Sequence, residues 1–205
     1  MNFGEQGICS SLFPIVFLLS SYLLEKIDLN FMRELQTKIE KQEEQDFRIA
    51  NAILKQLFTP FQPITEKMPS KSAYDMRMSA FTNQSTHIYA IELKSRTQDL
   101  SKYKTLPITV RKLCNLMKAR REGDKLIYMV LLNNEEYYIF DLDTIQVPLT
   151  SIDFWNIKKV QFDDTSLQEE TPTIFLKLDK AIIHGKFTIT NGCIRTKVKK
   201  PKEAT

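Results

Sequence analysis

Residue types that support several common chemistries are scarce in this chain of 205 residues, which has 5 glycines, 3 cysteines and 2 histidines. The cysteines are scattered and none stands in a CxxC pair, so a disulfide framework is excluded and a reducing, intracellular compartment fits. His87 and His184 are not spaced as a zinc pair. No glycine-rich phosphate loop is present, which argues against a nucleotide-binding fold or a small-molecule cofactor.

The basic residues outnumber the acidic ones by 29 to 25, which gives a net charge of +4, and they occur in clusters. Such clusters supply affinity for phosphates without reading base sequence. A solvated helix face and a disordered tail would have the same composition, so both interpretations stay open. The residues that we predict to contact nucleic acid are Arg96, Arg111, Lys112 and Lys118.

The N-terminal segment has no charged residue from Gln6 to Leu24, a borderline length for a membrane span. No Lys or Arg precedes it, so it is a poor signal peptide. It is either a membrane anchor that leaves the rest of the chain in the cytoplasm, or an adventitious helix or a translation start set too early, with Met32 as the true start. We favour the second interpretation. The chain then divides into an apolar segment (1–31), a main domain (32–195) and a basic tail (196–205).

Hydrophobic periodicity predicts helices and strands in a mixed order. A helix is expected from Arg33 to Phe58, and a second helix is expected to start at Pro107 and to stop at Gly123. Phe154, Trp155 and Ile157 indicate a helical turn or a short edge element. The predicted strands are Phe61 to Met68, Lys125 to Leu132, Tyr137 to Leu142, Thr173 to Leu178 and Ala181 to Ile189.

The triplet Glu92-Leu93-Lys94 is the single place in the chain where an acidic residue stands two positions before a lysine. It ends an apolar run that begins at Ile88 and is typical of a buried strand. Charges in such a strand are costly unless they are paired or bind a metal. Because alternate residues of a strand share a face, Glu92 and Lys94 are expected to point to the same side.

A hairpin would give Glu92 an acidic neighbour. The segment 73–79 alternates between apolar and polar residues, with Tyr74, Met76 and Met78 on its apolar face. A polar, turn-forming stretch separates it from the strand of Glu92. If the hairpin is symmetric about Asn83-Gln84, Phe81 pairs with Thr86 and Asp75 lies opposite Glu92. Opposed β-carbons lie ~5 Å apart, and carboxylates at that spacing suit a hard cation such as Mg²⁺. A slip of one residue in the register would separate the two acids.

Asp75 followed by Glu92-Leu93-Lys94 at the end of a strand resembles the metal-binding motif of the PD-(D/E)XK (restriction endonuclease-like) nuclease superfamily. The resemblance extends over roughly Arg33 to Leu142. It implies an α/β fold with a mixed central sheet flanked by helices, to which this chain would add extra C-terminal strands. One departure is Tyr74, which stands where the family has proline.

The resemblance also implies roles for individual residues. Asp75 and Glu92 would bind Mg²⁺, with Mn²⁺ as a substitute, and the backbone carbonyl of Leu93 would be a further ligand. Lys94 would position or activate the attacking water. Glu43 of the first helix is a further candidate ligand, although the acids of that helix would equally form a solvated face.

The function implied is Mg²⁺-dependent hydrolysis of phosphodiester bonds in DNA, inside the cell. The alternative is a catalytically inactive module of the same fold that binds nucleic acid or a protein partner. Members of the family often dimerise to cut both strands. The sequence leaves the oligomeric state, the form of the substrate and the choice between internal and terminal cutting open.

Overall fold

Residues 13–98, 100, 102–133, 135–145, 152–158 and 168–199 are described in a computed structural model. The chain divides into two units, Met1–Glu43 and Glu44–Thr205. Helix α1 (Phe13–Leu57) begins in the first unit and ends in the second. The boundary between the units therefore falls inside a helix that is longer than the one predicted. Within the residues described, no helix has a stretch long and apolar enough to cross a membrane.

The described strands of the second unit form two sheets. The larger sheet has the order β1-β2-β3-β5-β6-β9-β10 and the smaller one the order β4-β8-β7. The strands of the larger sheet are β1 (Ile64–Lys67), β2 (Met76–Phe81), β3 (Thr86–Arg96), β5 (Lys125–Leu132), β6 (Glu136–Asp141), β9 (Ile183–Thr190) and β10 (Cys193–Lys199). The smaller sheet contains β4 (Thr105–Thr109), β7 (Ile152–Lys158) and β8 (Gln168–Lys177), and the remaining elements are α2 (Val110–Ala119) and the 3₁₀ turns η1 (Thr59–Phe61) and η3 (Leu178–Lys180).

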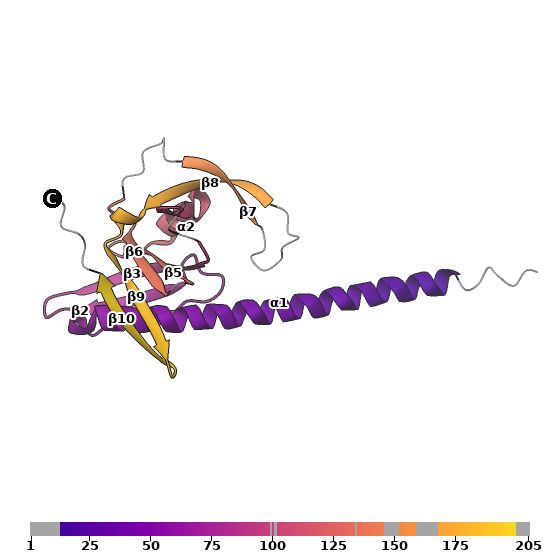
Figure 1. The fold of residues 1–205 in the computed structure, drawn as a ribbon, viewed down its shortest axis with the longest axis horizontal. Helices are drawn as coiled ribbons and strands as arrows, with labels where there is room; N and C mark the ends of the chain where they lie inside the picture. Colours follow the sequence, from indigo (N-terminus) through magenta and orange to yellow (C-terminus); the bar gives the residue numbers. More distant parts are fainter. Residues whose placement is uncertain are drawn as a thin grey trace, which may run out of the picture. The chain divides into compact units, whose positions relative to one another are not determined.

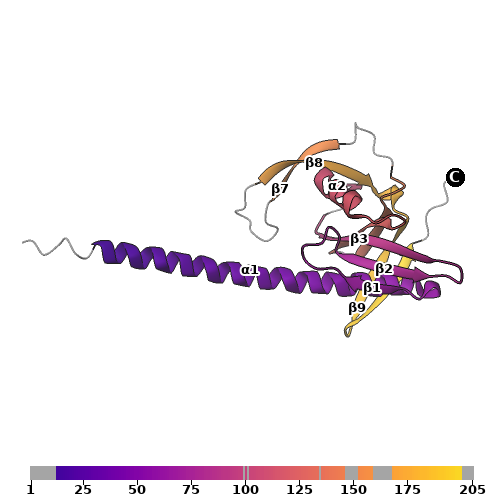
Figure 2. The ribbon, with the colours of Figure 1, turned by 180° about the vertical axis from the view of Figure 1, so that it is seen from behind.

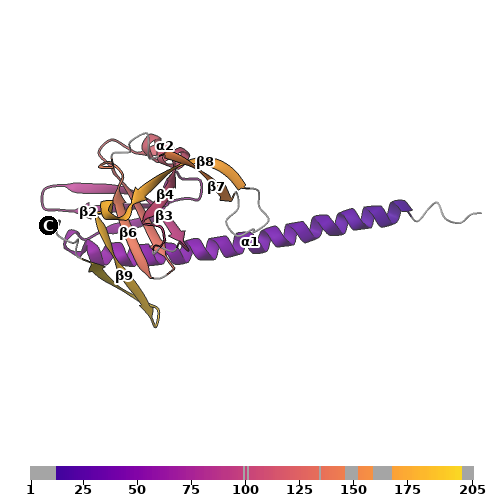
Figure 3. The ribbon, with the colours of Figure 1, turned by 45° about the horizontal axis from the view of Figure 1, so that its top comes forward.

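Both faces of the larger sheet are covered. The part of α1 that belongs to the second unit packs its apolar residues, Ile53 and Leu54 among them, on Met76, Ile91 and Met129 of one face (Figures 1 and 2). Helix α2 and the smaller sheet cover the other face, where they form a second buried cluster (Figure 3). Burial on both sides explains why β5 is apolar after its exposed first residue, Lys125, as predicted for a central strand.

The register of the hairpin β2–β3 is the one predicted from its symmetry. Phe81 pairs with Thr86, and the antiparallel ladder continues to the pair Met76 and Ile91. Strand β3 then pairs in parallel with β5, and α2 lies in the chain between these two strands. Along the chain, the structure therefore has a helix, an antiparallel meander of three strands, a second helix and a parallel strand. Strand β4 is inserted before the second helix, α2.

The start of the second helix was predicted wrongly. Pro107 lies in strand β4, and α2 begins at Val110, where the side chain of Thr109 accepts a hydrogen bond from the backbone N–H of Lys112. Strand β4 is at the edge of its sheet, which is where a strand tolerates a residue without a backbone N–H. The helix also ends at Ala119, before Gly123, whose φ of 85° belongs to a following turn.

The C-terminal region contains more sheet than predicted. The residues around Trp155 form strand β7 at the edge of the smaller sheet, so the predicted short edge element is confirmed and the alternative of a helical turn is wrong. Asn191 and Gly192 have φ values of 51° and 75°, which suit the tight turn between β9 and β10. Strand β10 includes Thr196 to Lys199, which were assigned to a basic tail, and the residues after Lys199 lie outside the described part. Charged residues are common on such an edge strand because they oppose pairing with other chains.

Gly185 provides a test of the packing between β9 and its neighbours. A Cβ at this position would overlap the carbonyl oxygen of Lys197 in β10 and the hydroxyl of the buried Tyr137 in β6. We therefore expect Gly185→Ala to lower the free energy of unfolding by about 1–3 kcal/mol, measured by urea denaturation. Thr188→Ala, an exposed change on the same strand, should stay within about 0.5 kcal/mol of the wild type. Equal stability of the two variants would contradict the described packing.

Candidate functional site

Asp75 is fixed beside the strand of Glu92 by hydrogen bonds on both sides of that residue. Its backbone N–H donates to the carbonyl of Ile91 at 3.0 Å, and its Oδ2 accepts from the N–H of Leu93 at 2.8 Å. Its carbonyl accepts from the N–H of Met68 at 2.9 Å. The Asp75 carboxylate is thus held next to Glu92 by backbone contacts, and its position does not depend on a flexible side chain.

Glu92 lies in the middle of the larger sheet and is fully buried, with 0 % of its surface exposed. Neither of its carboxylate oxygens accepts a well-aligned hydrogen bond among the described residues. Two ammonium groups approach it instead. Lys112 Nζ of α2 lies 2.7 Å from Oε2, and Lys94 Nζ of β3 lies 3.5 Å from Oε1. The carboxylate is therefore balanced by charge more than by directed hydrogen bonds.

The proton affinity of Glu92 reflects this surrounding. Burial, and after it the negative charge of Asp75, raise the pKa of its carboxyl group from the ordinary 4.5 to about 7, although Lys94 and Lys112 act in the opposite direction. Desolvation penalises the charged form of a carboxyl group. Near neutral pH the group therefore exchanges between its acid and its carboxylate, as acid–base groups of active sites often do.

Hydrogen bonds to the carbonyl of Pro107 connect the strands around Glu92. Tyr128 of β5 is the parallel partner of Glu92 and is fully buried, and its hydroxyl donates to the carbonyl of Pro107 at 2.9 Å. Arg96 donates to the same carbonyl at 3.4 Å. Burial raises the pKa of the Tyr128 hydroxyl. These contacts attach β4 and β3 to β5 on the side of the sheet that Glu92 faces.

The other residues predicted from the sequence are divided between the surface and the interior. Arg111 and Lys118 are exposed on α2, whereas Arg96 is half-buried and contacts Pro107. Glu43 is exposed on α1 and belongs to the first unit. No group of three His, Cys, Asp or Glu side chains that could hold a metal occurs within the described residues. The side chains that the fold brings together are Asp75, Glu92 and Lys94.

Lys112 joins this group although the sequence pointed to it as a contact for nucleic acid. Its side chain is 29 % exposed and its ammonium is closer to Glu92 than that of Lys94. A helix that connects two parallel strands starts near the carboxyl end of the first strand. The position of Lys112 in the first turn of α2 was therefore the signal that could have placed it beside Glu92.

Comparisons with known proteins leave the family open. No protein-family model and no curated protein matches the chain. Among solved structures, the chain is similar to Hjc, a Holliday junction resolvase from the archaeal hyperthermophile Archaeoglobus fulgidus, with 15 % identity and a TM-score of 0.37 over 63 % of this chain and 83 % of that one. A TM-score this low establishes neither a shared fold nor a shared activity.

The raised pKa of Glu92 predicts how stability depends on pH. Between the ordinary value of 4.5 and about 7, the folded protein keeps a proton that the unfolded chain releases. This contribution to stability is complete below pH 4.5 and is lost as the pH rises through 7. From pH 5 to pH 8 in EDTA, the wild type should lose roughly 1–3 kcal/mol relative to Glu92→Gln.

The measurement is urea denaturation of both proteins at the two pH values. Glu122→Gln removes an exposed carboxyl group and serves as the control, since its difference from the wild type should not change with pH. If the difference in free energy of unfolding between the wild type and Glu92→Gln is the same at pH 5 and pH 8, Glu92 does not titrate in this range.

Proposed function

We propose that this protein is a Mg²⁺-dependent nuclease that hydrolyses phosphodiester bonds in DNA, with a restriction endonuclease-like core. The observation that carries the proposal is the hairpin β2–β3, whose register brings Asp75 next to a buried Glu92 with Lys94 on the same strand. The order of elements around it, a meander β1–β2–β3 followed by α2 and the parallel β5, supports the same core.

The donor atoms of the site fit a hard divalent cation. Asp75 and Glu92 offer carboxylate oxygens, and those of Glu92 are buried without well-aligned donors. The carbonyl of Leu93 would be the third ligand from the protein, and the remaining positions would be filled by water and phosphate oxygens, as is usual for Mg²⁺. A bound Mg²⁺ would neutralise charge on the phosphate and make its bound water a better nucleophile at neutral pH.

The two lysines would then have separate tasks. Lys94 is 43 % exposed and near Oε1 of Glu92, so its ammonium group can reach a water beside the carboxylate and orient it for attack. Lys112 contacts Oε2 at 2.7 Å and would turn toward a phosphate once a cation balances Glu92. In hydrolysis the water oxygen forms the new bond to phosphorus and releases a proton to solvent, while the bond from phosphorus to the leaving oxygen breaks and that oxygen takes up a proton from solvent.

A second candidate function rests on Lys112. If its ammonium is the permanent counter-ion of Glu92, the cluster is a buried ion pair and the protein is an inactive module that binds nucleic acid through the exposed lysines and arginines of α2. The lack of a third acidic side chain near Asp75 and Glu92 among the described residues favours this alternative. The two functions differ in whether metal-dependent cleavage occurs.

The proposal predicts that the purified full chain degrades DNA with Mg²⁺ or Mn²⁺ and does not do so in EDTA. Asp75→Asn, Glu92→Gln and Lys94→Ala should each reduce the rate by at least about a hundredfold, because each removes a ligand or an acid–base group. The rates are measured on labelled single-stranded and duplex DNA, and circular dichroism shows whether each variant folds.

Glu122→Gln is the matched control, since it removes an exposed carboxyl group outside the site and should retain the wild-type rate. Absence of metal-dependent cleavage by folded wild-type protein would favour the binding module. Cleavage that persists unchanged in all three site variants would assign the activity to other residues and overturn the proposed site.

A further inference from the structure

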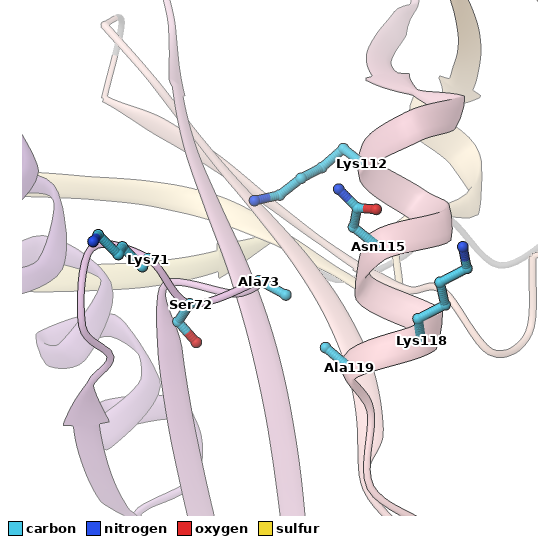
Figure 4. Close-up of a pocket in the computed structure, with 7 residues that line it drawn as sticks. All are labelled: Lys71, Ser72, Ala73, Lys112, Asn115, Lys118 and Ala119. Atoms are coloured by element: carbon cyan, nitrogen blue, oxygen red, sulfur yellow. The ribbon is translucent and has the colours of Figure 1, made fainter.

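A basic hollow lies next to the candidate site and shares Lys112 with it. It has a volume of about 430 Å³ and lies between the loop before Asp75 and helix α2. Figure 4 shows the two segments on opposite sides of the hollow, with the side chain of Lys112 extending from α2 toward the loop. The residues that line it are Lys71, Ser72, Ala73, Lys112, Asn115, Lys118 and Ala119.

The charge of the hollow is of one sign. Three of its lining residues are lysines and none is acidic. Lys112 is balanced by Glu92, whereas Lys71 and Lys118 are exposed and form no ion pair in the described part of the chain. The hollow therefore has about two uncompensated positive charges, together with the side-chain amide of Asn115 and the hydroxyl of Ser72 as polar groups.

These charges match a terminal phosphate better than an internal one. A phosphomonoester carries about −1.5 to −2 charges at pH 7, whereas an internal phosphodiester carries one. A hollow of about 430 Å³ is within the usual size of sites for small ligands, so it accommodates the end of a strand more readily than a length of duplex. With an internal phosphate bound, the same strand would also have to leave the hollow in both directions.

We infer that this hollow binds the terminal phosphate of a DNA strand, through Lys71 and Lys118, and so places the neighbouring phosphodiester at Glu92. Lys112 connects the two places, since it lines the hollow and contacts the Glu92 carboxylate. The inference rests on the proposed nuclease function for its substrate, and it adds that the enzyme acts from strand ends.

Binding can be measured without cleavage. Three internally labelled single-stranded oligonucleotides of one sequence, with a 5′-phosphate, a 3′-phosphate or hydroxyl groups at both ends, are titrated with the full chain in EDTA by fluorescence anisotropy. One of the phosphorylated oligonucleotides should bind about tenfold more tightly than the hydroxyl form, as expected for one added charge-assisted contact. The phosphorylated oligonucleotide that binds more tightly shows whether the 5′ or the 3′ end is recognised.

The double variant Lys71→Ala/Lys118→Ala should lose this preference and bind all three oligonucleotides alike. Lys55→Ala/Lys180→Ala removes the same charge from two exposed lysines outside the hollow and should keep the preference. Equal binding of the three oligonucleotides by the wild type would overturn the inference. So would a hollow variant that weakens all three equally, since that indicates contact with internal phosphates.

The binding experiment tests the phosphate site independently of the cleavage assay that tests the proposed nuclease. A preference for a phosphorylated end without any metal-dependent cleavage would retain the phosphate site and reject the nuclease. Cleavage by the wild type without such a preference would retain the nuclease and reject the phosphate site.

Discussion

The Glu92 carboxylate lies between the larger sheet and helix α2, where an isolated negative charge would cost several kcal/mol of desolvation. The fold balances it with Lys112 from α2 and Lys94 from the same strand. To balance this charge, α2 must pack on the sheet so that Lys112 reaches Glu92. That position of α2 depends in turn on the parallel pairing of β3 with β5, the two strands that α2 connects. Asp75 adds a second negative charge beside it through two hydrogen bonds to the backbone of β3.

A proton, an ammonium group and a metal ion would compete for this carboxylate. With a pKa of about 7, Glu92 is partly protonated at neutral pH, and a carboxyl group must lose its proton to bind a metal. If the proposed function is correct, metal binding releases a proton and frees Lys112 from its ion pair. The same side chain lines the basic hollow, so the charge on Glu92 would affect how strongly a phosphate is held there.

The sequence allowed the hairpin to be predicted because two independent patterns agreed. The alternation of Met76 and Met78 with polar residues and the turn-forming stretch before Thr86 both indicated a hairpin, and the assumption of symmetry about Asn83-Gln84 gave the register that the structure has. Strand β5 could be predicted equally well, because both of its faces are buried and its sequence is a continuous apolar run after Lys125. Tyr74 was placed on the wrong face: it precedes β2 and packs with the second cluster and not with Met76.

The features that were missed depend on contacts far apart in the chain. Pro107 has the local signature of a helix start, but its pairing with Phe175 places it in β4. The lysines of β10 have the composition of a tail, and only the partner strand β9 makes them part of a sheet. Lys112 could be assigned to a helix from its spacing, whereas its contact with Glu92 depends on how that helix packs on the sheet.

The proposed nuclease requires Asp75 and Glu92 to bind one divalent cation together. The most direct measurement is the broadening of backbone amide signals in NMR spectra as Mn²⁺ is added to isotope-labelled protein. We expect the signals of Asp75, Glu92 and Leu93 to broaden first, and Glu92→Gln to remove this effect. Broadening confined to other parts of the chain, or the same broadening in Glu92→Gln, would contradict it.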